Sequence, residues 1–286
     1  MLVPSAIAYP AVFLLGSAVG SFVNVCIYRL PRDRSVVAPP SHCPRCGAGL
    51  GPSELVPLFS FLALGRKCRH CGGPIAWRYF IVELTTGVVF VAALEACGLG
   101  AVLLPCWIFA AVVIAVVFTD LDHMIIPDKL VIAGLFAAVL SEVLVVAEGR
   151  APLLSVTIPG TPFGLPRVVA GGGLGVGVFM LIRGFSQLLF RREGMGLGDV
   201  KLAGAVGAML GPAGALLSFG LAILTGALVG VLLIVLRLRR RMEYLPFGPF
   251  LAVSALVALL APSGLSRAAT AVYLRWLATL GLGAGF

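Results

Sequence analysis

The sequence predicts an all-α polytopic membrane protein with about eight transmembrane helices and one small polar insertion. Three observations lead to this class: hydrophobic residues make up 60% of the 286 residues, charged residues make up only 12%, and the mean hydropathy is +1.08. A soluble domain carries about 25% charged residues on its hydrated surface. A chain with half that share has lipid as its main solvent.

The apolar runs divide the chain into spans of the length that a bilayer requires, about 20 residues each. The first run has no Lys or Arg before it, unlike a secretory signal peptide, and is expected to be an uncleaved span within residues 1–31. The run 202–236 is too long for one crossing, and Gly211-Pro212 is a turn signal that would divide it into two spans. The other spans are expected at 79–97, 101–119, 130–147, 168–190 and 245–261.

The polar insertion and the basic residues set the organisation and orientation. Residues 32–78 form the insertion, 79–262 the main bundle, and 263–286 a tail that is interfacial or extracytoplasmic. Loops rich in Lys and Arg stay in the cytoplasm, so we expect the N-terminus outside and the insertion inside. The net charge of +9 is then explained by the orientation of the chain in the membrane. Basic residues scattered over loops do not indicate a nucleic-acid partner. Of the 21 basic residues, the only ones expected outside are Arg150, Arg167, Arg267 and Arg275.

Four of the seven cysteines form two pairs in the insertion, C-P-R-C-G and C-R-H-C-G, separated by 21 residues. Two such pairs suit tetrahedral zinc coordination by thiolates, and the glycine after each pair permits a tight turn. The alternative is two disulfides, which a reducing cytoplasmic location disfavours. Four thiolates leave no open position for water, so the zinc is expected to be structural. The proposed ligands are Cys43, Cys46, Cys68 and Cys71.

The remaining cysteines and the neighbouring histidines are given simpler roles. His42 and His70 adjoin the cysteine pairs, and we expect solvated turn residues, with substitution for a metal ligand as the alternative. Cys26, Cys97 and Cys106 lie on apolar runs and are expected to be small packing residues.

Acidic residues are rare in this chain, 12 in all, and four of them lie at two membrane edges. A carboxylate at the centre of a bilayer costs about 2.5 to 3.5 kcal/mol, so an Asp near a span suggests a function. Asp120, Asp122 and Asp128 lie in T-D-L-D-H-M-I-I-P-D, at the end of one span, and Asp199 lies in M-G-L-G-D-V-K-L, at the start of another. The alternative for Asp199 is a helix-capping role.

A G-x-G-D motif at the start of one span, with an Asp at the end of an earlier span, resembles the GxGD membrane aspartic peptidases, which include presenilin and the type IV prepilin peptidases. Other blocks are similar to the prepilin peptidases and occur in order across most of the chain. They are G-S-F-V-N-V-C-I-Y-R-L-P at 20–31, the four-cysteine loop, W-R-Y-F-I-V-E-L at 77–84, D-L-D-H-M-I-I-P-D at 120–128, G-M-G-L-G-D-V-K-L at 194–202 and P-F-G-P-F-L-A at 246–252.

The resemblance implies a bacterial cytoplasmic-membrane enzyme that removes the leader peptide from type IV prepilins or pseudopilins. It assigns the catalytic carboxylates to Asp120 and Asp199 and the metal ligands to the four paired cysteines, while Asp122 and Asp128 match positions of uncertain role. We expect the two catalytic carboxylates to share one proton near neutral pH, because close like charges do not ionise together. Members with the cysteine loop also methylate the new N-terminus with S-adenosylmethionine.

The site of the methyl donor is not located by the sequence. The glycines of G-M-G-L-G-D do not follow a strand in a βαβ unit, so they are not a dinucleotide-type loop. Glu83 is a supporting candidate, with a helix-end ion pair to Arg78 as its alternative role. Lys201 is another, since it lies close in sequence to Asp199, with snorkelling to the lipid headgroups as its alternative.

Two functions from other classes compete with the peptidase. An ion-coupled carrier would use Asp120 and Asp199 as proton relays, but it predicts charges near the midplane and broken helices in matching halves. A non-enzymatic adaptor would dock a partner on the zinc loop, but it leaves two acidic clusters at one face without a role.

Overall fold

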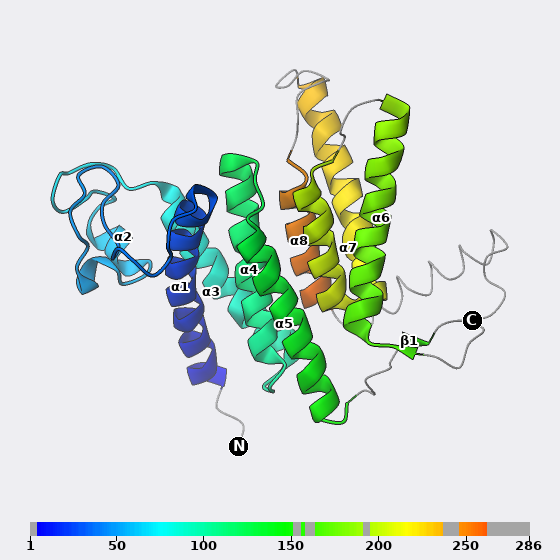
Figure 1. The fold of residues 1–286 in the computed structure, drawn as a ribbon. Helices are drawn as coiled ribbons and strands as arrows, with labels where there is room; N and C mark the ends of the chain where they lie inside the picture. Colours follow the sequence, from blue (N-terminus) through cyan, green and yellow to red (C-terminus); the bar gives the residue numbers. More distant parts are fainter. Residues whose placement is uncertain (1–4, 151–155, 158–163, 191–194, 237–245, 262–286) are drawn as a thin grey trace.

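A computed structural model describes residues 5–150, 156–157, 164–190, 195–236 and 246–261, and helices form most of this part (Figure 1). Three short helices lie in or beside the insertion: η1 (Leu30–Arg32), η2 (Pro52–Glu54) and α2 (Phe59–Ala63). Two antiparallel strands, β1 (Val156–Thr157) and β2 (Gly164–Leu165), form a minimal hairpin. The long helices are α1 (Ser5–Arg29), α3 (Trp77–Cys97), α4 (Leu103–His123), α5 (Asp128–Ala147), α6 (Arg167–Phe190), α7 (Leu197–Val235) and α8 (Gly248–Leu260).

Six of these helices, α1 and α3 to α7, are long and apolar enough to cross a membrane, so the chain is a multi-pass membrane protein as predicted. The helix α8 is shorter, with 13 residues. At 1.5 Å per residue it rises about 20 Å, less than the roughly 30 Å of a bilayer core. The described part of the span expected at 245–261 is therefore shorter than predicted.

The helix α7 changes direction at Gly211, where the sequence predicts a turn. Gly211 has φ 71° and ψ 175°, outside the helical region, and Pro212 follows it. Because φ is positive, a residue with a side chain would be strained there. Figure 1 shows the chain descending to this point and rising after it, so α7 supplies two of the roughly eight crossings.

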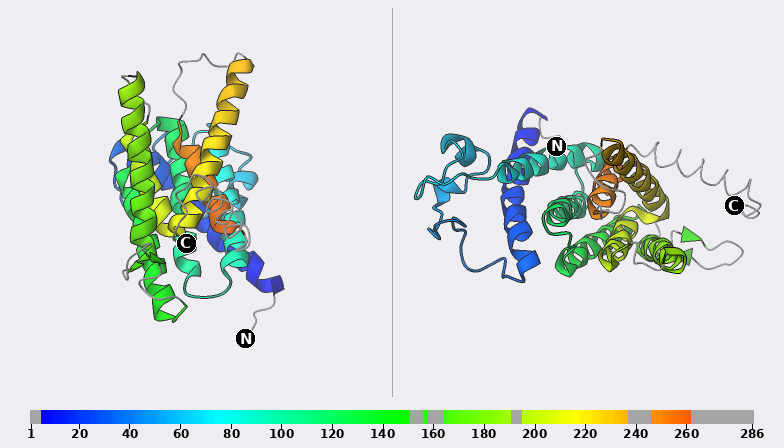
Figure 2. Two further views of the ribbon diagram at one scale, coloured as in Figure 1. Left: turned by 90° about the vertical axis from the view of Figure 1, so that its right-hand side faces the viewer. Right: turned by 90° about the horizontal axis from the view of Figure 1, so that it is seen from above.

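Successive helices alternate in direction, which gathers particular loops at each end of the bundle. Figure 1 shows that the insertion and the starts of α5, α7 and α8 share the upper end. The N-terminal end of α1 and the connection between α5 and α6 lie at the lower end, and Figure 2 shows the insertion at one side of the bundle, beside α1 and α3. The expected common face of the insertion and the acidic clusters is therefore present. The basic run Arg237–Arg241 and the tail 263–286 lie outside the described residues.

The helix α4 is the centre of the bundle and packs against α1, α3, α5 and α8. Its inward stripe includes Phe109, Val113 and Val116, each with no exposed surface. The spacing of four and three residues places these side chains on one face of the helix. A helix enclosed by four others has a fixed position, so the residues at its end are held by the whole bundle.

The pair α6 and α7 is joined by small residues rather than large ones. A Cβ atom on Gly171 would lie 2.0 Å from the carbonyl oxygen of Gly207, and one on Gly175 would lie 2.2 Å from that of Ala203. Such backbone contact is typical of helix packing in membranes, where dispersion replaces hydrophobic association. The first half of α7, which begins beside Asp199, is thereby held against α6.

Candidate active site

Asp120 lies in the last turn of α4, with 5% of its surface exposed. The helix ends at Met124, whose left-handed backbone (φ 53°) lets its N–H donate to the carbonyl of Asp120 at 2.8 Å. This is a C-cap that stops the helix in a defined conformation. The bundle and the cap together fix the position of the Asp120 carboxylate.

Asp199 lies in the first turn of α7 and is also 5% exposed. The N-cap is Gly196, and its backbone N–H faces the Asp199 carboxylate three positions later. Asp199 therefore occupies a position from which an acidic side chain can stabilise a helix start, as the alternative from the sequence proposed. Capping alone does not explain the site, because a second buried carboxylate lies opposite.

Asp120 and Asp199 line the same cavity of about 270 Å³, and their charges interact. One carboxylate comes from the end of a helix and the other from the start of a helix. Other parts of the lining are Met124, Ile125 and Ile126 after α4, Gly196 and Gly198 before Asp199, and Phe247 before α8. The two residues that the sequence selects as a pair are therefore brought together in a partly apolar cavity.

Gly248, the first residue of α8, is a part of this site that the sequence did not assign to it. Its backbone N–H faces the Asp120 carboxylate, as a free N–H at a helix start can do. A Cβ atom on Gly248 would lie 2.5 Å from Oδ2 of Asp120 and 3.2 Å from Cδ1 of Ile126. The sequence signal at this position is a Gly-Pro pair at the start of an apolar run. It predicts a helix start and does not predict a contact with Asp120.

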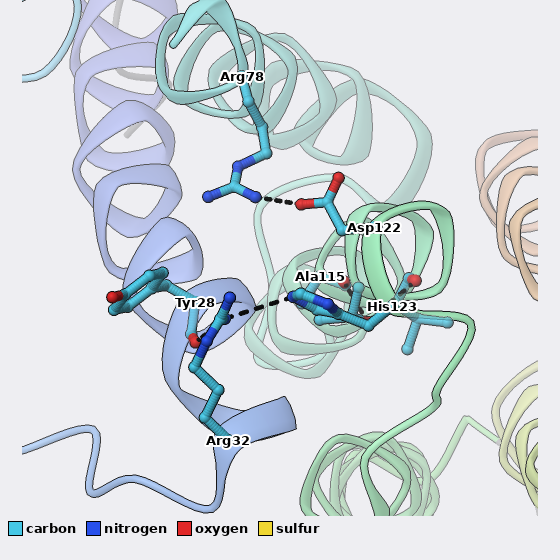
Figure 3. Close-up of polar contacts among 8 residues, drawn as sticks. Tyr28, Arg32, Arg78, Ala115, Asp122 and His123 are labelled. Carbon is cyan, nitrogen blue, oxygen red and sulfur yellow. Dashed lines mark hydrogen bonds and ion pairs between the residues drawn. The ribbon is translucent and has the colours of Figure 1, made fainter. Parts of the chain in front are cut away.

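The other two aspartates of the upstream cluster form ion pairs instead of joining the catalytic candidates. Arg78 from α3 contacts Asp122 (Figure 3), and Nζ of Lys201 lies 2.8 Å from Oδ1 of Asp128. The Lys201 pair is largely exposed, with 49% and 65% of the two side chains accessible. Lys201 and Asp128 also line the cavity of the catalytic candidates, at its rim.

Glu83 lies away from the aspartates, on the side of α3 that faces the insertion. The sequence offered Arg78 as its partner, but Arg78 contacts Asp122 instead. The Glu83 carboxylate accepts the backbone N–H of Leu58 at 2.7 Å and a hydrogen bond from the hydroxyl of Ser21. Glu83 is 8% exposed. Its role is therefore not the helix-end ion pair.

The four paired cysteines meet in the insertion, and their sulfur atoms all lie within 4.8 Å of one another. Tetrahedral coordination at a zinc–sulfur distance of about 2.3 Å places sulfur atoms about 3.8 Å apart. The four thiols therefore fit one metal ion after a small contraction. Of the histidines considered as substitutes, His42 contacts the Pro40 carbonyl and His70 contacts Glu54, so neither belongs to the cluster.

Each cysteine pair forms the same small loop. The N–H of Gly47 donates to the carbonyl of Cys43, and the N–H of Gly72 donates to that of Cys68, each at 2.9 Å. Both glycines have positive φ, 74° and 66°, as the sequence predicts for tight turns. Backbone N–H groups of Cys46 and Arg45 point at the Cys43 sulfur and lower the pKa of this thiol to about 7, which favours the thiolate that binds metal.

Two of the remaining cysteines have a relationship that the sequence did not indicate. Cys97 ends α3, Cys106 lies in the first turn of α4, and their sulfur atoms are 3.0 Å apart at the end of the bundle opposite Asp120. Cys26 is buried on α1, as a packing residue would be. Cys106 is also buried in the hydrophobic core and Cys97 packs against it, so the expectation of packing residues holds for all three, and the pair adds a contact between sulfur atoms.

Comparisons with known proteins match both halves of the chain. Residues 14–96 match a model described as the bacterial peptidase A24 N-terminal domain, and residues 107–231 match the type IV leader peptidase family. The first match contains the cysteine insertion with α1 and α3, and the second contains both aspartates.

Curated relatives agree with these matches. A protein of Aeromonas hydrophila is 33% identical over 91% of this chain and 92% of its own length, and one of Pseudomonas aeruginosa is 34% identical over 86% and 88%. A third, from Myxococcus xanthus, is 36% identical over 78% of this chain, which spans 62% of that relative. All three are named prepilin leader peptidase/N-methyltransferase. No solved structure matches the chain significantly.

Proposed function

The chain belongs to the type IV leader peptidase family, and on that premise we propose that it is a membrane aspartic endopeptidase with Asp120 and Asp199 as its catalytic pair. Its substrates are type IV prepilins or related pseudopilins, and it then methylates the new N-terminus. One observation carries the catalytic assignment: two buried carboxylates from different helices line one cavity. The family match favours this function over the ion-coupled carrier and the adaptor.

The arrangement suits peptide hydrolysis without a covalent intermediate. One carboxylate accepts a proton from water, the water oxygen attacks the carbonyl carbon of the leader glycine, and the other carboxylate donates a proton to the carbonyl oxygen. The roles then exchange as the amine leaves. The N–H groups of Gly248 and Gly196 each hold one carboxylate in place, so each acid or base is oriented before substrate arrives.

The cysteine cluster has the donor set of a structural zinc site. Cys43, Cys46, Cys68 and Cys71 would hold Zn²⁺ and close residues 32–78 into a compact unit beside α1 and α3. Coordination by four thiolates leaves no position for substrate. Zinc therefore supports the shape of the insertion, and no step of peptide cleavage passes through it.

We place the catalytic end in the cytoplasm and the N-terminal end of α1 outside, because the basic loops gather with the insertion. A prepilin leader is then cut at the cytoplasmic edge of the bacterial inner membrane. S-adenosylmethionine supplies a methyl group from its sulfonium: a nitrogen–carbon bond forms on the new amine, the carbon–sulfur bond breaks to leave a thioether, and the amine releases a proton.

The decisive assay uses the purified full-length protein in detergent with a prepilin-like peptide, with and without S-adenosylmethionine. Mass spectrometry of the product should show cleavage after the leader glycine in both cases and a mass gain of one methyl group only with the donor. Asp120→Asn and Asp199→Asn should each abolish cleavage, because Asn keeps the shape and loses the ionisable proton. Near wild-type cleavage by either folded variant contradicts the aspartic mechanism.

A further inference from the structure

A second cavity, of about 670 Å³, lies between the insertion and the cytoplasmic ends of α1 and α3. It is separate from the cavity of Asp120 and Asp199, with which it shares no lining residue. The cysteine loop forms one wall through Cys43 and Cys68. Peptide cleavage, as proposed above, makes no use of this space.

Glu83 is an unusual part of the cavity wall, because it is a buried carboxylate without a cation. It accepts hydrogen bonds from Leu58 and Ser21, but no lysine or arginine among the described residues forms an ion pair with it. A buried charge is costly unless an opposite charge compensates it. A second carboxylate, Glu54, lines the same cavity, with 8% of its side chain exposed. Glu83 is therefore suited to a positively charged group of a ligand.

Four arginines also line the cavity, Arg29, Arg32, Arg45 and Arg78. Three of them already contact protein groups, and Nε of Arg78 has no hydrogen-bond partner among the described residues. Arg29 donates to the carbonyls of Ser35, Pro39 and Pro40 at 3.0, 2.6 and 3.3 Å. As Figure 3 shows, Arg78 contacts Asp122, and Arg32 lies between Tyr28 and His123. None of these contacts involves Glu83, so its carboxylate is available to a positively charged group of a ligand.

Asn24 adds to the cavity a hydrogen-bond acceptor that lacks a donor within the described part of the chain. It is 2% exposed, and its Nδ2 donates to the carbonyl of Tyr79 at 3.1 Å. Its Oδ1 has no hydrogen-bond partner among the described residues. Such an acceptor suits an amino group of a ligand. The aromatic rings of Tyr28 and Phe61 supply flat apolar surface in the same cavity, as a purine requires.

We propose that this cavity is the methyl-donor site: it binds S-adenosylmethionine, with Glu83 compensating the cationic methionine half and Asn24 accepting from the adenine. The inference rests on the methyl-transfer half of the proposed function, which requires a donor site. The volume is within the range of about 300 to 1,000 Å³ that small-molecule sites occupy. The cysteine loop would then have a role in donor binding, since it forms one wall of the cavity.

The test measures equilibrium binding of S-adenosylmethionine and of its neutral thioether, S-adenosylhomocysteine, to the full-length zinc-loaded protein in detergent. Glu83→Gln should weaken binding of the sulfonium compound at least about tenfold and that of the thioether by less. Asn24→Ala should weaken both about equally, by roughly fivefold. The matched control is Glu142→Gln, another buried glutamate, which lies on α5 beside Arg167 and far from the cavity.

Zinc content and peptide cleavage report the folding of each variant independently of donor binding. All variants should retain both, since none of the changed residues touches the metal cluster or Asp120. If Glu83→Gln and Asn24→Ala both bind the two compounds as tightly as Glu142→Gln, the donor site lies elsewhere and this inference alone is wrong. If the wild type binds neither compound, the methyl-transfer half of the proposed function fails as well. If Glu83→Gln loses zinc, the binding affinities of Asn24→Ala alone decide whether the donor site lies in this cavity.

Discussion

Oδ2 of Asp120 lies only 2.5 Å from the position that a Cβ atom on Gly248 would occupy. The start of α8 thus reaches the proposed catalytic carboxylate so closely that no larger residue fits without movement of one of the two. The closeness serves the site, because it allows the Gly248 N–H to hold the carboxylate. A glycine far along the chain is therefore part of the geometry of the candidate active site.

Gly248→Ala should reduce cleavage by about 100-fold while the protein still inserts and binds zinc. The added methyl group displaces the Asp120 carboxylate, and a misplacement of about 1 Å is enough for a loss of this size. Steady-state cleavage of a prepilin-like peptide measures it. Gly230→Ala is the control, since a Cβ there meets nothing within 4 Å. Equal activity of the two variants would show that the contact is unimportant.

Asp122→Asn and Asp128→Asn should each leave measurable cleavage, within about tenfold of the wild type. Both residues form ion pairs at the edge of the bundle, and exposed pairs contribute about 0 to 1 kcal/mol. The same peptide assay ranks them against Asp120→Asn and Asp199→Asn. Complete loss in a folded Asp122→Asn or Asp128→Asn protein would mean that the catalytic pair has been assigned to the wrong carboxylates.

Cys43→Ser or Cys68→Ser should release the metal and open residues 32–78 to proteolysis. Thiolate coordination supplies folding free energy to an insertion with a small core of its own. Metal analysis and limited trypsin digestion measure the two effects, and Cys26→Ala, on α1, is the control that keeps all four ligands. Wild-type protein that is fully active without bound metal would refute the structural-zinc assignment.

The orientation in the membrane can be tested with thiols introduced at the two ends of the bundle. Val37 in the insertion is 87% exposed, and Arg150 after α5 is exposed at the other end. In intact cells an impermeant thiol reagent should label Arg150→Cys and not Val37→Cys above the background of the unaltered protein. The reverse pattern would invert the topology.

Local features of the fold could be predicted from the sequence because local residues determine them. The turn at Gly211-Pro212 follows from a glycine that permits positive φ and a proline that cannot continue a helix. The two cysteine loops follow from Gly47 and Gly72 in the same way. The apolar runs gave the positions of α3 to α6 to within a few residues.

Contacts between distant elements could not be predicted in this way. Whether Arg78 pairs with Glu83 or with Asp122 depends on how α3 rotates against α4, and the hydrophobic pattern of a lipid-facing helix does not determine its rotation. The same reason applies to Gly248 at Asp120 and to the sulfur atoms of Cys97 and Cys106. The pairing of Asp120 with Asp199 was reached only through the family resemblance, not through spacing.

The last turn of α4 lines both of the cavities described above. Asp120 lines the smaller cavity, while Asp122 and His123 line the larger one. Residues two positions apart on a helix point about 200° apart, so one turn can serve both sides. A newly exposed amine would need to pass only around the end of one helix, a distance on the order of 10 Å. Under the proposed function, the cleaved prepilin would move from the aspartate cavity to the methyl-donor cavity without leaving the enzyme.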